Sequence, residues 1–153
     1  NGYCWSRFLK TKSELPLEMF KLIHFISKVF NITIKNIRCD NSGENKKFKE
    51  LINENKEHNI NFEFTAPYTP ELNGKIERKF ATLYGKARSM LNAARLPHNM
   101  RKGLWAQCAK TASQLENIIV SKAEDQTPAE KMHGENPTWN KYLRTFQELA
   151  IFE

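Results

Sequence analysis

Two acidic residues stand where a carboxylate could do chemistry. Asp40 follows the β-branched segment 32–39 and precedes the turn-forming sequence Asn-Ser-Gly, so we expect it at the carboxyl end of a strand. Open α/β sheets place their ligand sites at that end of the strands. Glu77 comes directly after a segment rich in proline and glycine, in the expected first turn of a long helix. Two such carboxylates are hard ligands that suit Mg²⁺ or Mn²⁺ rather than zinc.

Each acid also has a simpler interpretation. Asp40 could cap the loop that follows it, and Glu77 could complement the positive N-terminal end of its own helix. Glu77 lies about 100° from the middle of the apolar stripe of that helix, at the edge of the core, where a carboxylate can face a cleft. Since acids are common, the pair alone does not distinguish a metal site from these structural roles.

Residue patterns predict the elements that position Asp40. Residues 3–10 alternate and are rich in aromatic side chains, which predicts a strand. A helix follows, with Ser13 as the expected N-cap, Pro16 in its first turn and apolar residues at helical spacing as far as residue 30. Residues 32–39 form the next expected strand, so the order strand, helix, strand predicts a parallel crossover.

The second half of the chain is predicted to be mostly helical. A short helix around residues 48–52 and a strand at 61–64 precede a loop over residues 65–74, which contains two prolines and a glycine. Long helices are expected from residue 75 and from about residue 97 or 104 to 119. Thr127 and Glu130 have the spacing of a capping box, which opens a short helix closed by Gly134. The expected inward residues are Ile76, Phe80, Leu83, Ala87, Met90 and Ala94 on the first long helix and Trp105, Cys108, Ala112, Leu115 and Ile119 on the second.

The composition indicates a globular domain of 153 residues, 40% of them apolar. No apolar run approaches the roughly 20 residues of a membrane span. Three widely spaced cysteines and four histidines show no disulfide framework and no zinc-binding spacing, which favours a reducing intracellular setting.

Positive charge is concentrated in one stretch. The net charge is +7, and residues 75–102 hold eight basic residues and one acid, so the remainder is nearly neutral. A basic helix of this kind suits a polyanion such as nucleic acid. A solvated helix face in a basic protein is the alternative.

Two segments carry a family resemblance. Residues 37–44 read Ile-Arg-Cys-Asp-Asn-Ser-Gly-Glu, and residues 67–78 end in the signature Asn-Gly-x-x-Glu-Arg. Together they resemble the integrase catalytic core of copia-type LTR retrotransposons, a class of transposable element, and the interval between Asp40 and Glu77 is close to that of the family. Further matches at residues 8–14, 87–91, 96–97, 105–109, 117, 127–134 and 143–146 extend the resemblance over nearly the whole chain.

The resemblance implies an α/β, ribonuclease-H-like integrase core that lacks its first strands, with a mixed sheet flanked by helices. Residues 1–120 would form the partial catalytic core, and residues 121–153 a C-terminal extension. The implied function is DNA integration by a polynucleotidyl transferase: endonuclease trimming of the 3′ ends of the element, then strand transfer into target DNA. The partners would be element-end and target DNA, with a homo-oligomer in the intact protein and neither a membrane nor a small-molecule cofactor. The protein would be intracellular, and nuclear when it acts on DNA.

The resemblance also assigns roles to residues. Asp40 and Glu77 match two members of a catalytic triad of carboxylates that binds two Mg²⁺ or Mn²⁺ ions. Asn73 and Gly74 match the active-site loop. The expected nucleic-acid-binding residues are Lys75, Arg78, Lys79 and Lys86.

The match departs from the family pattern at some positions. The first catalytic aspartate and the first two strands are expected upstream of residue 1. Ser42 and Gln147 stand where the family has glycine. Whether this chain is an enzyme therefore stays open, and we expect residues 1–153 alone to bind DNA without joining it. The alternatives are a catalytically inactive nucleic-acid-binding remnant and an inert remnant of a mobile element. An aspartate on an upstream strand would support an enzyme over both alternatives.

Overall fold

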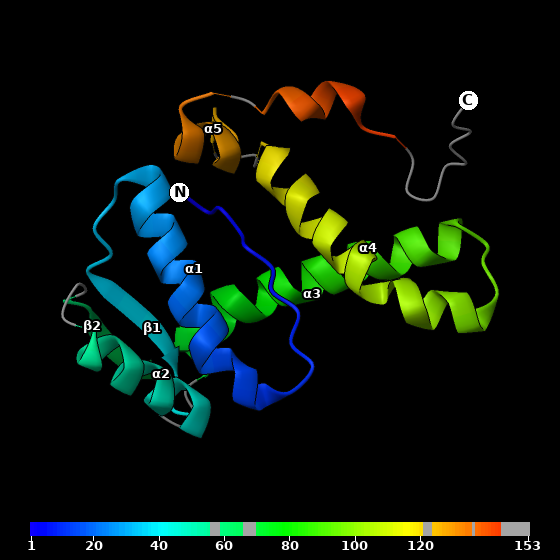
Figure 1. Ribbon diagram of the computed structural model, residues 1–153. Coiled ribbons are helices and arrows are strands. Elements are labelled where there is room, and N and C mark those ends of the chain that lie inside the picture. The colour runs from blue at the N-terminus through cyan, green and yellow to red at the C-terminus, as the bar shows by residue number, and fades with distance from the viewer. Residues whose placement is uncertain (56–58, 66–69, 121–123, 136, 145–153) are drawn as a thin grey trace, which may run out of the picture. The chain divides into compact units, whose positions relative to one another are not determined.

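The computed structural model describes residues 1–55, 59–65, 70–120, 124–135 and 137–144 (Figure 1). The chain divides into two compact units. Residues 7–76 form the first, here called the sheet unit, and residues 1–6 with 77–153 form the second, here called the helical unit. The division at residue 120 expected from the resemblance remains a prediction.

The sheet unit consists of two parallel strands and the helices that pack on them. A 3-10 turn (Lys12–Glu14) leads into α1 (Leu15–Phe30), and β1 (Asn36–Asp40), α2 (Gly43–Glu54) and β2 (Asn61–Thr65) follow. The strands pair in register from Asn36 opposite Asn61 to Asp40 opposite Thr65. The α/β class, helix α2 and both of these strands are therefore confirmed. The described residues contain these two parallel strands and not the mixed sheet that the resemblance implies.

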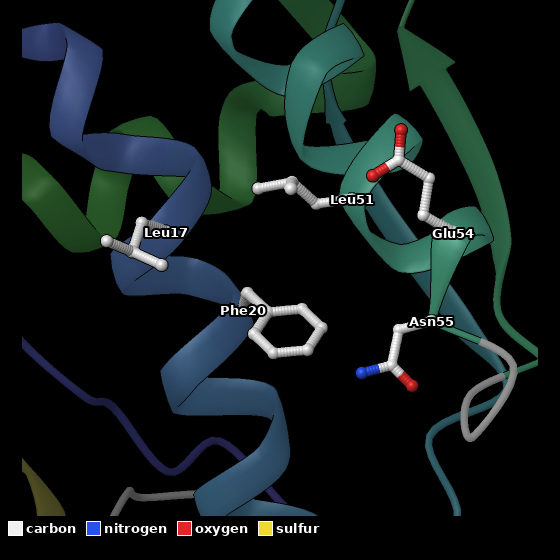
Figure 2. A pocket seen from close by; sticks show the side chains of 5 residues that line it. All are labelled: Leu17, Phe20, Leu51, Glu54 and Asn55. Carbon is white, nitrogen blue, oxygen red and sulfur yellow. The ribbon is translucent and has the colours of Figure 1, made fainter.

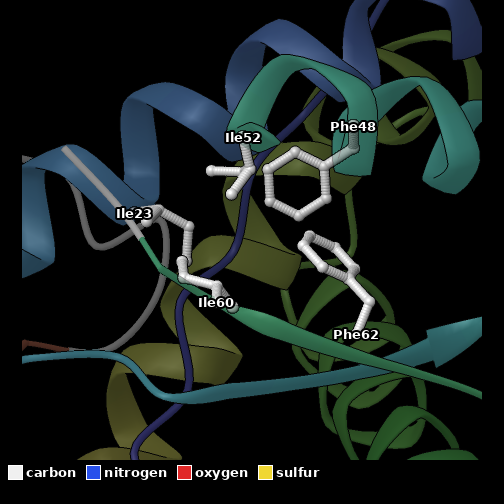
Figure 3. Packing of buried hydrophobic residues seen from close by; sticks show 5 residues of the cluster. All are labelled: Ile23, Phe48, Ile52, Ile60 and Phe62. Carbon is white, nitrogen blue, oxygen red and sulfur yellow. The ribbon is translucent and has the colours of Figure 1, made fainter. Parts of the chain in front are cut away.

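The core of the sheet unit is apolar and partly aromatic. Ile23 of α1 and Phe48 and Ile52 of α2 point toward Ile60 and Phe62 on the strand side (Figure 3). The rings of Phe48 and Phe62 meet edge to face, with centroids 5.4 Å apart and planes at 77°, the geometry that aromatic quadrupoles prefer. Phe48 and Ile52 are one helical turn apart, so both side chains leave the same face of α2.

The helical unit contains most of α3 (Pro70–Ala93), which begins in the sheet unit, followed by α4 (His98–Ile118), α5 (Pro128–His133) and a 3-10 turn (Thr138–Tyr142). The capping box of α5 is confirmed. The Thr127 hydroxyl accepts from the Glu130 backbone N–H, and the Glu130 carboxylate accepts from the Thr127 N–H. Gly134 ends the helix with φ of 83°, in the left-handed region that glycine tolerates. No described helix has the length and apolarity needed to cross a membrane.

The predicted strand at residues 3–10 is wrong, because the structure assigns no strand there. Two of its residues bind helix α4 instead. The Cys4 N–H donates to Asn117 Oδ1 at 2.8 Å, and Asn117 Nδ2 donates to the Cys4 carbonyl at 2.9 Å. A hydroxyl–hydroxyl bond of 2.7 Å joins Ser6 to Ser113. One side-chain amide thus supplies the donor and acceptor that a neighbouring strand would supply. The parallel crossover runs through α2 rather than α1.

The predicted inward faces of the long helices are partly wrong. Trp105 and Ile119 were expected to lie inward, but they are 50% and 49% exposed, and Ile76 and Phe80 of α3 are exposed as well. Leu83 and Ala87 are buried on α3, as predicted. The buried residues of α4 are Cys108, Ala112, Ser113 and Asn117. Two of these are polar because they hold the N-terminal backbone, a role that hydrophobic periodicity does not reveal.

Candidate active site and nucleic-acid interface

Asp40 lies at the carboxyl end of β1, as predicted, and its side chain is exposed. Its Oδ1 atom accepts from Asn45 Nδ2 at 2.5 Å and from the Ser42 backbone N–H at 3.3 Å. Ser42 in turn caps α2, since its hydroxyl accepts from the Asn45 N–H at 3.4 Å. Asp40 therefore closes the turn between β1 and α2, which is the simpler role that its position allowed.

The hydrogen bonds around Asp40 favour its charged form. The bond with the Ser42 side chain contributes most to lowering the pKa of Asp40. The bond with Asn45 and the charge of Lys12 add to it, and together they outweigh the opposing effect of burial. The carboxylate is therefore ionised at neutral pH. An exposed, ionised carboxylate at a strand end has the right chemistry for a hard cation.

Glu77 is exposed on α3. Because α3 begins at Pro70 rather than at residue 75, Glu77 lies about two helical turns from the start. Its predicted first-turn position is therefore wrong, and the alternative role as a partner of the helix dipole loses its basis, because that effect falls off within the first turn. Glu77 belongs to the helical unit and Asp40 to the sheet unit. Their approach to one another remains a prediction.

Asn73 and Gly74 lie within α3, so their predicted place in a loop is wrong. The reason is Pro70, which can either interrupt a helix or open one. Proline is favoured at the first helical position, where its missing N–H costs nothing. The structure starts α3 at that proline, which leaves residues 73 and 74 one turn inside the helix. The intervening part of the expected loop, residues 66–69, lies outside the described residues.

The described part of the chain contains no group of three or more His, Cys, Asp or Glu side chains that could hold a metal ion. Asp40 fits Mg²⁺ or Mn²⁺ as one hard ligand. A two-metal centre needs several such ligands arranged together, and the described residues do not provide that arrangement. The donor chemistry thus fits a divalent cation at one position, without an assembled site.

Two of the expected DNA-binding lysines already have an acidic partner. Glu116 of α4 forms ion pairs with both lysines: Lys79 Nζ lies 2.8 Å from Oε2, and Lys86 Nζ contacts Oε1. Burial raises the pKa of Glu116, but the hydrogen bonds and charges of the two lysines outweigh it and lower the pKa overall. The two lysines are seven residues apart on α3, so they leave nearly the same face. A contribution of either lysine to DNA binding would have to compete with this ion pair.

Glu116 was missed in the sequence, although a signal exists. No acid occurs between Arg78 and Leu115, so Glu116 is the first carboxylate available to a basic helix. Which lysines it meets depends on how α4 packs, and no residue pattern gives that. Of the other expected nucleic-acid-binding residues, Arg78 is exposed on α3, whereas the Lys75 side chain lies outside the described part of the structure.

The sheet unit also has a hollow between α1 and α2. Its described lining consists of three apolar side chains and two polar ones: Leu17, Phe20, Leu51, Glu54 and Asn55 (Figure 2). Glu54 contributes the single ionisable side chain among these residues. The hollow thus has no pair of carboxylates like the one predicted for Asp40 and Glu77.

No family model matches the chain. It is 35% identical over 153 residues to the retrovirus-related Pol polyprotein from transposon TNT 1-94 of Nicotiana tabacum, an alignment that covers 97% of this chain and 10% of that protein. It is 28% identical over 145 residues to the corresponding Pol polyprotein from transposon RE1 of Arabidopsis thaliana, covering 94% of this chain and 9% of that protein. The chain spans about a tenth of the length of these relatives. It is therefore homologous, over nearly its whole length, to a segment of retrovirus-related Pol polyproteins from plant transposons.

Proposed function

We propose that this chain is part of a retrotransposon integrase core with a ribonuclease-H-like fold, and that its parent protein integrates DNA. The observation that carries the proposal is the place of Asp40. An exposed carboxylate with a lowered pKa lies at the carboxyl end of a parallel strand, in a chain homologous to transposon Pol polyproteins. Open α/β sheets use that end of the strands for ligands. The substrates would be the ends of the element and target DNA, which places the protein in the nucleus when it acts.

In this proposal Asp40 and Glu77 are catalytic residues that hold Mg²⁺ or Mn²⁺ together with a further aspartate of the parent protein. The metal ions would stabilise the attacking and leaving oxygens at phosphorus. Ser42 and Asn45 would help Asp40 to bind the metal, because their hydrogen bonds orient one carboxylate oxygen and keep the carboxylate ionised. Arg78 and its basic neighbours on α3 would contact DNA phosphates.

The first test is metal binding in residues 1–153. We expect Mn²⁺ to broaden the backbone amide NMR signals next to Asp40 and, if the two acids approach, those next to Glu77. Asp40→Asn should abolish the broadening at both places. Glu50→Gln is the matched control, because it removes one exposed charge from α2 of the same unit. Broadening that Asp40→Asn leaves unchanged would refute the metal role of Asp40.

The second test is activity in a longer segment of the parent Pol polyprotein. With a pre-cleaved donor end and Mn²⁺, that segment should join donor to target DNA, and Asp40→Asn should reduce the joined product at least 100-fold. Glu50→Gln should leave the product unchanged. Equal amounts of product from the Asp40→Asn variant and the wild type would exclude Asp40 from catalysis.

A second candidate is a nucleic-acid-binding remnant without catalysis. The turn-closing bonds of Asp40 favour it, because they give this residue a structural reason to be present. Duplex binding by the longer segment, with no joined product and no Mn²⁺-dependent broadening at Asp40, would establish this alternative.

A further inference from the structure

We propose that the turn between α3 and α4 binds the phosphate backbone of duplex DNA. The site consists of four basic side chains, here called the basic turn: Arg88, Arg95, Arg101 and Lys102. The inference rests on the proposed function, because it names where that function makes its DNA contact. It also assigns the main DNA contact to the basic turn and not to Lys79 and Lys86, which the resemblance implies.

The basic turn carries positive charge that no nearby acid among the described residues balances. Arg88, Arg95 and Lys102 are exposed, and Arg101 is half-buried. No acid lies between residues 78 and 115, and no basic-turn side chain forms an ion pair with any described carboxylate. Lys79 and Lys86, in contrast, share Glu116. Of the five basic side chains between residues 80 and 115 that form no ion pair with a described carboxylate, four therefore belong to the basic turn.

The basic turn spans the connection between two helices. Helices α3 and α4 meet at residues 94–97 (Figure 1). Arg101 Nη1 donates to Asn92 Oδ1 at 3.4 Å, which links the first turn of α4 to the end of α3. Arg88 lies on α3, which ends at Ala93, and Arg95 lies in the connection that follows. The four cations thus lie within residues 88–102, on both sides of the connection between α3 and α4.

Two of these cations, Arg101 and Lys102, lie near the N-terminal end of α4. Its first turn contains no acid, and Pro97 at its N-cap offers no side-chain hydrogen bond. Cations are disfavoured at a helix N-terminus, where the exposed backbone N–H groups are themselves positive. Arg101, in the first turn of α4, is therefore unfavourably placed in the protein alone. A phosphate at the turn would relieve that repulsion and accept hydrogen bonds from the guanidinium groups.

The side chains of the turn favour a duplex over unpaired nucleotides. Residues 88–102 include no Phe, Tyr or Trp, whereas proteins that bind single strands stack bases on aromatic rings. Arginine and lysine without stacking partners contact phosphates and read no sequence. Binding at the turn should therefore be independent of sequence and strongly dependent on salt.

The test uses two double variants of residues 1–153 that remove the same charge. Arg95→Gly with Lys102→Gln alters the basic turn, and Lys79→Gln with Lys86→Gln alters the paired lysines. Arg95 has φ of 51°, in the left-handed region where glycine is favoured at the end of a helix. Replacing it with glycine therefore removes the charge without straining the turn, and circular dichroism checks that both variants are folded.

Affinity for a duplex of random sequence is measured by fluorescence anisotropy at several salt concentrations. Each phosphate contact contributes about −0.9 to the log–log salt slope. We expect the turn variant to flatten the slope by nearly two such contacts, and the paired-lysine variant by less than one. A single Arg88→Gln variant, which should flatten it by about one contact, replaces the turn variant if that one unfolds.

The outcomes separate this inference from the proposed function. Suppose that the wild type binds the duplex and the folded turn variant has the same salt slope as the wild type. That result would overturn the basic turn alone, and so would a paired-lysine variant that flattens the slope as much as the turn variant does. A wild-type chain without any duplex affinity would overturn the proposed DNA-binding function as well.

Discussion

The sheet unit and the helical unit are each stabilised by a different kind of interaction. In the sheet unit, apolar side chains from two helices meet those beside the strands, and Phe48 and Ile52 are 1% and 0% exposed. In the helical unit, polar side chains link the elements. Asn117 and Ser113 bind the N-terminal segment, and Glu116 forms an ion pair that joins α4 to α3. Apolar packing follows residue periodicity, whereas polar links depend on a partner far away in the sequence. The first kind is therefore visible in a sequence and the second is not.

The largest expected effect is the loss of an aromatic side chain from the sheet unit. Phe48→Ala should lower the free energy of unfolding by about 3–5 kcal/mol, because it removes a fully buried ring and leaves a cavity. The three tryptophans lie outside the sheet unit. Amide hydrogen exchange in β1 and β2 is therefore the suitable measurement, and tryptophan fluorescence should report on the helical unit separately.

Val29→Ala on α1 is the matched control for this experiment, since Val29 is exposed. It should change the free energy of unfolding by less than about 0.5 kcal/mol. A cost of similar size from both variants would show that the apolar cluster is not what stabilises the sheet unit.

The next expected effect tests the polar link of the helical unit. Asn117→Ala should cost about 1–3 kcal/mol, because it leaves the N–H and carbonyl of Cys4 without their partner. The Cys4 amide should also exchange with solvent faster, since its donor loses Asn117 Oδ1. Gln114→Ala, at an exposed position of the same helix, should do neither. Unchanged exchange at Cys4 in the Asn117→Ala variant would contradict the link.

The sequence predicted the sheet unit better than the helical unit for the reason that this comparison gives. Residues 32–39 and 61–64 were expected as strands, and Asn36–Asp40 and Asn61–Thr65 are strands. Residues 3–10 have the same kind of alternation, yet a strand also needs a partner, and here Asn117 takes that place. Alternation reports a tendency of the segment itself, and pairing is decided by the rest of the molecule.

The candidate site shows the same division. The strand-end place of Asp40 follows from its neighbours in sequence and is confirmed. The start of α3 was misjudged because Pro70 is compatible with either a loop or the first position of a helix. Because α3 begins at Pro70, Gly74 lies in a helix and not in the expected loop. Glu116 was not foreseen, because its pairing with Lys79 and Lys86 requires the packing of two helices.

A smaller effect concerns the pH dependence of the helical unit. The folded-state pKa of Glu116 is lowered by its two lysines. Its contribution to stability is therefore fully present above the pKa of an unfolded glutamate and is lost as the pH falls through the lowered folded-state value. We expect Glu116→Gln to cost about 1 kcal/mol or less at pH 7, since the lysines are partly exposed and solvent screens the pair. In urea unfolding followed by tryptophan fluorescence, wild type and variant should converge in acid, and a constant difference down to pH 3 would contradict the ion pair.

The smallest effect on stability is expected at Asp40, where structure and proposed function can be separated. Asparagine keeps an oxygen that can accept from the Ser42 N–H and the Asn45 amide, so Asp40→Asn should change the free energy of unfolding by less than about 0.5 kcal/mol at pH 7. Alanine removes that acceptor and should cost more, about 1 kcal/mol, the usual net contribution of a hydrogen bond to stability. Yet both variants remove the charge, so both should abolish Mn²⁺ binding, because a neutral amide is a far weaker ligand for a hard cation than a carboxylate. If Asp40 only closes its turn, the order of stability stays the same and Mn²⁺ binding is equal in all three proteins. The asparagine variant is therefore decisive, since it retains the turn and removes only the charge that the proposed chemistry requires.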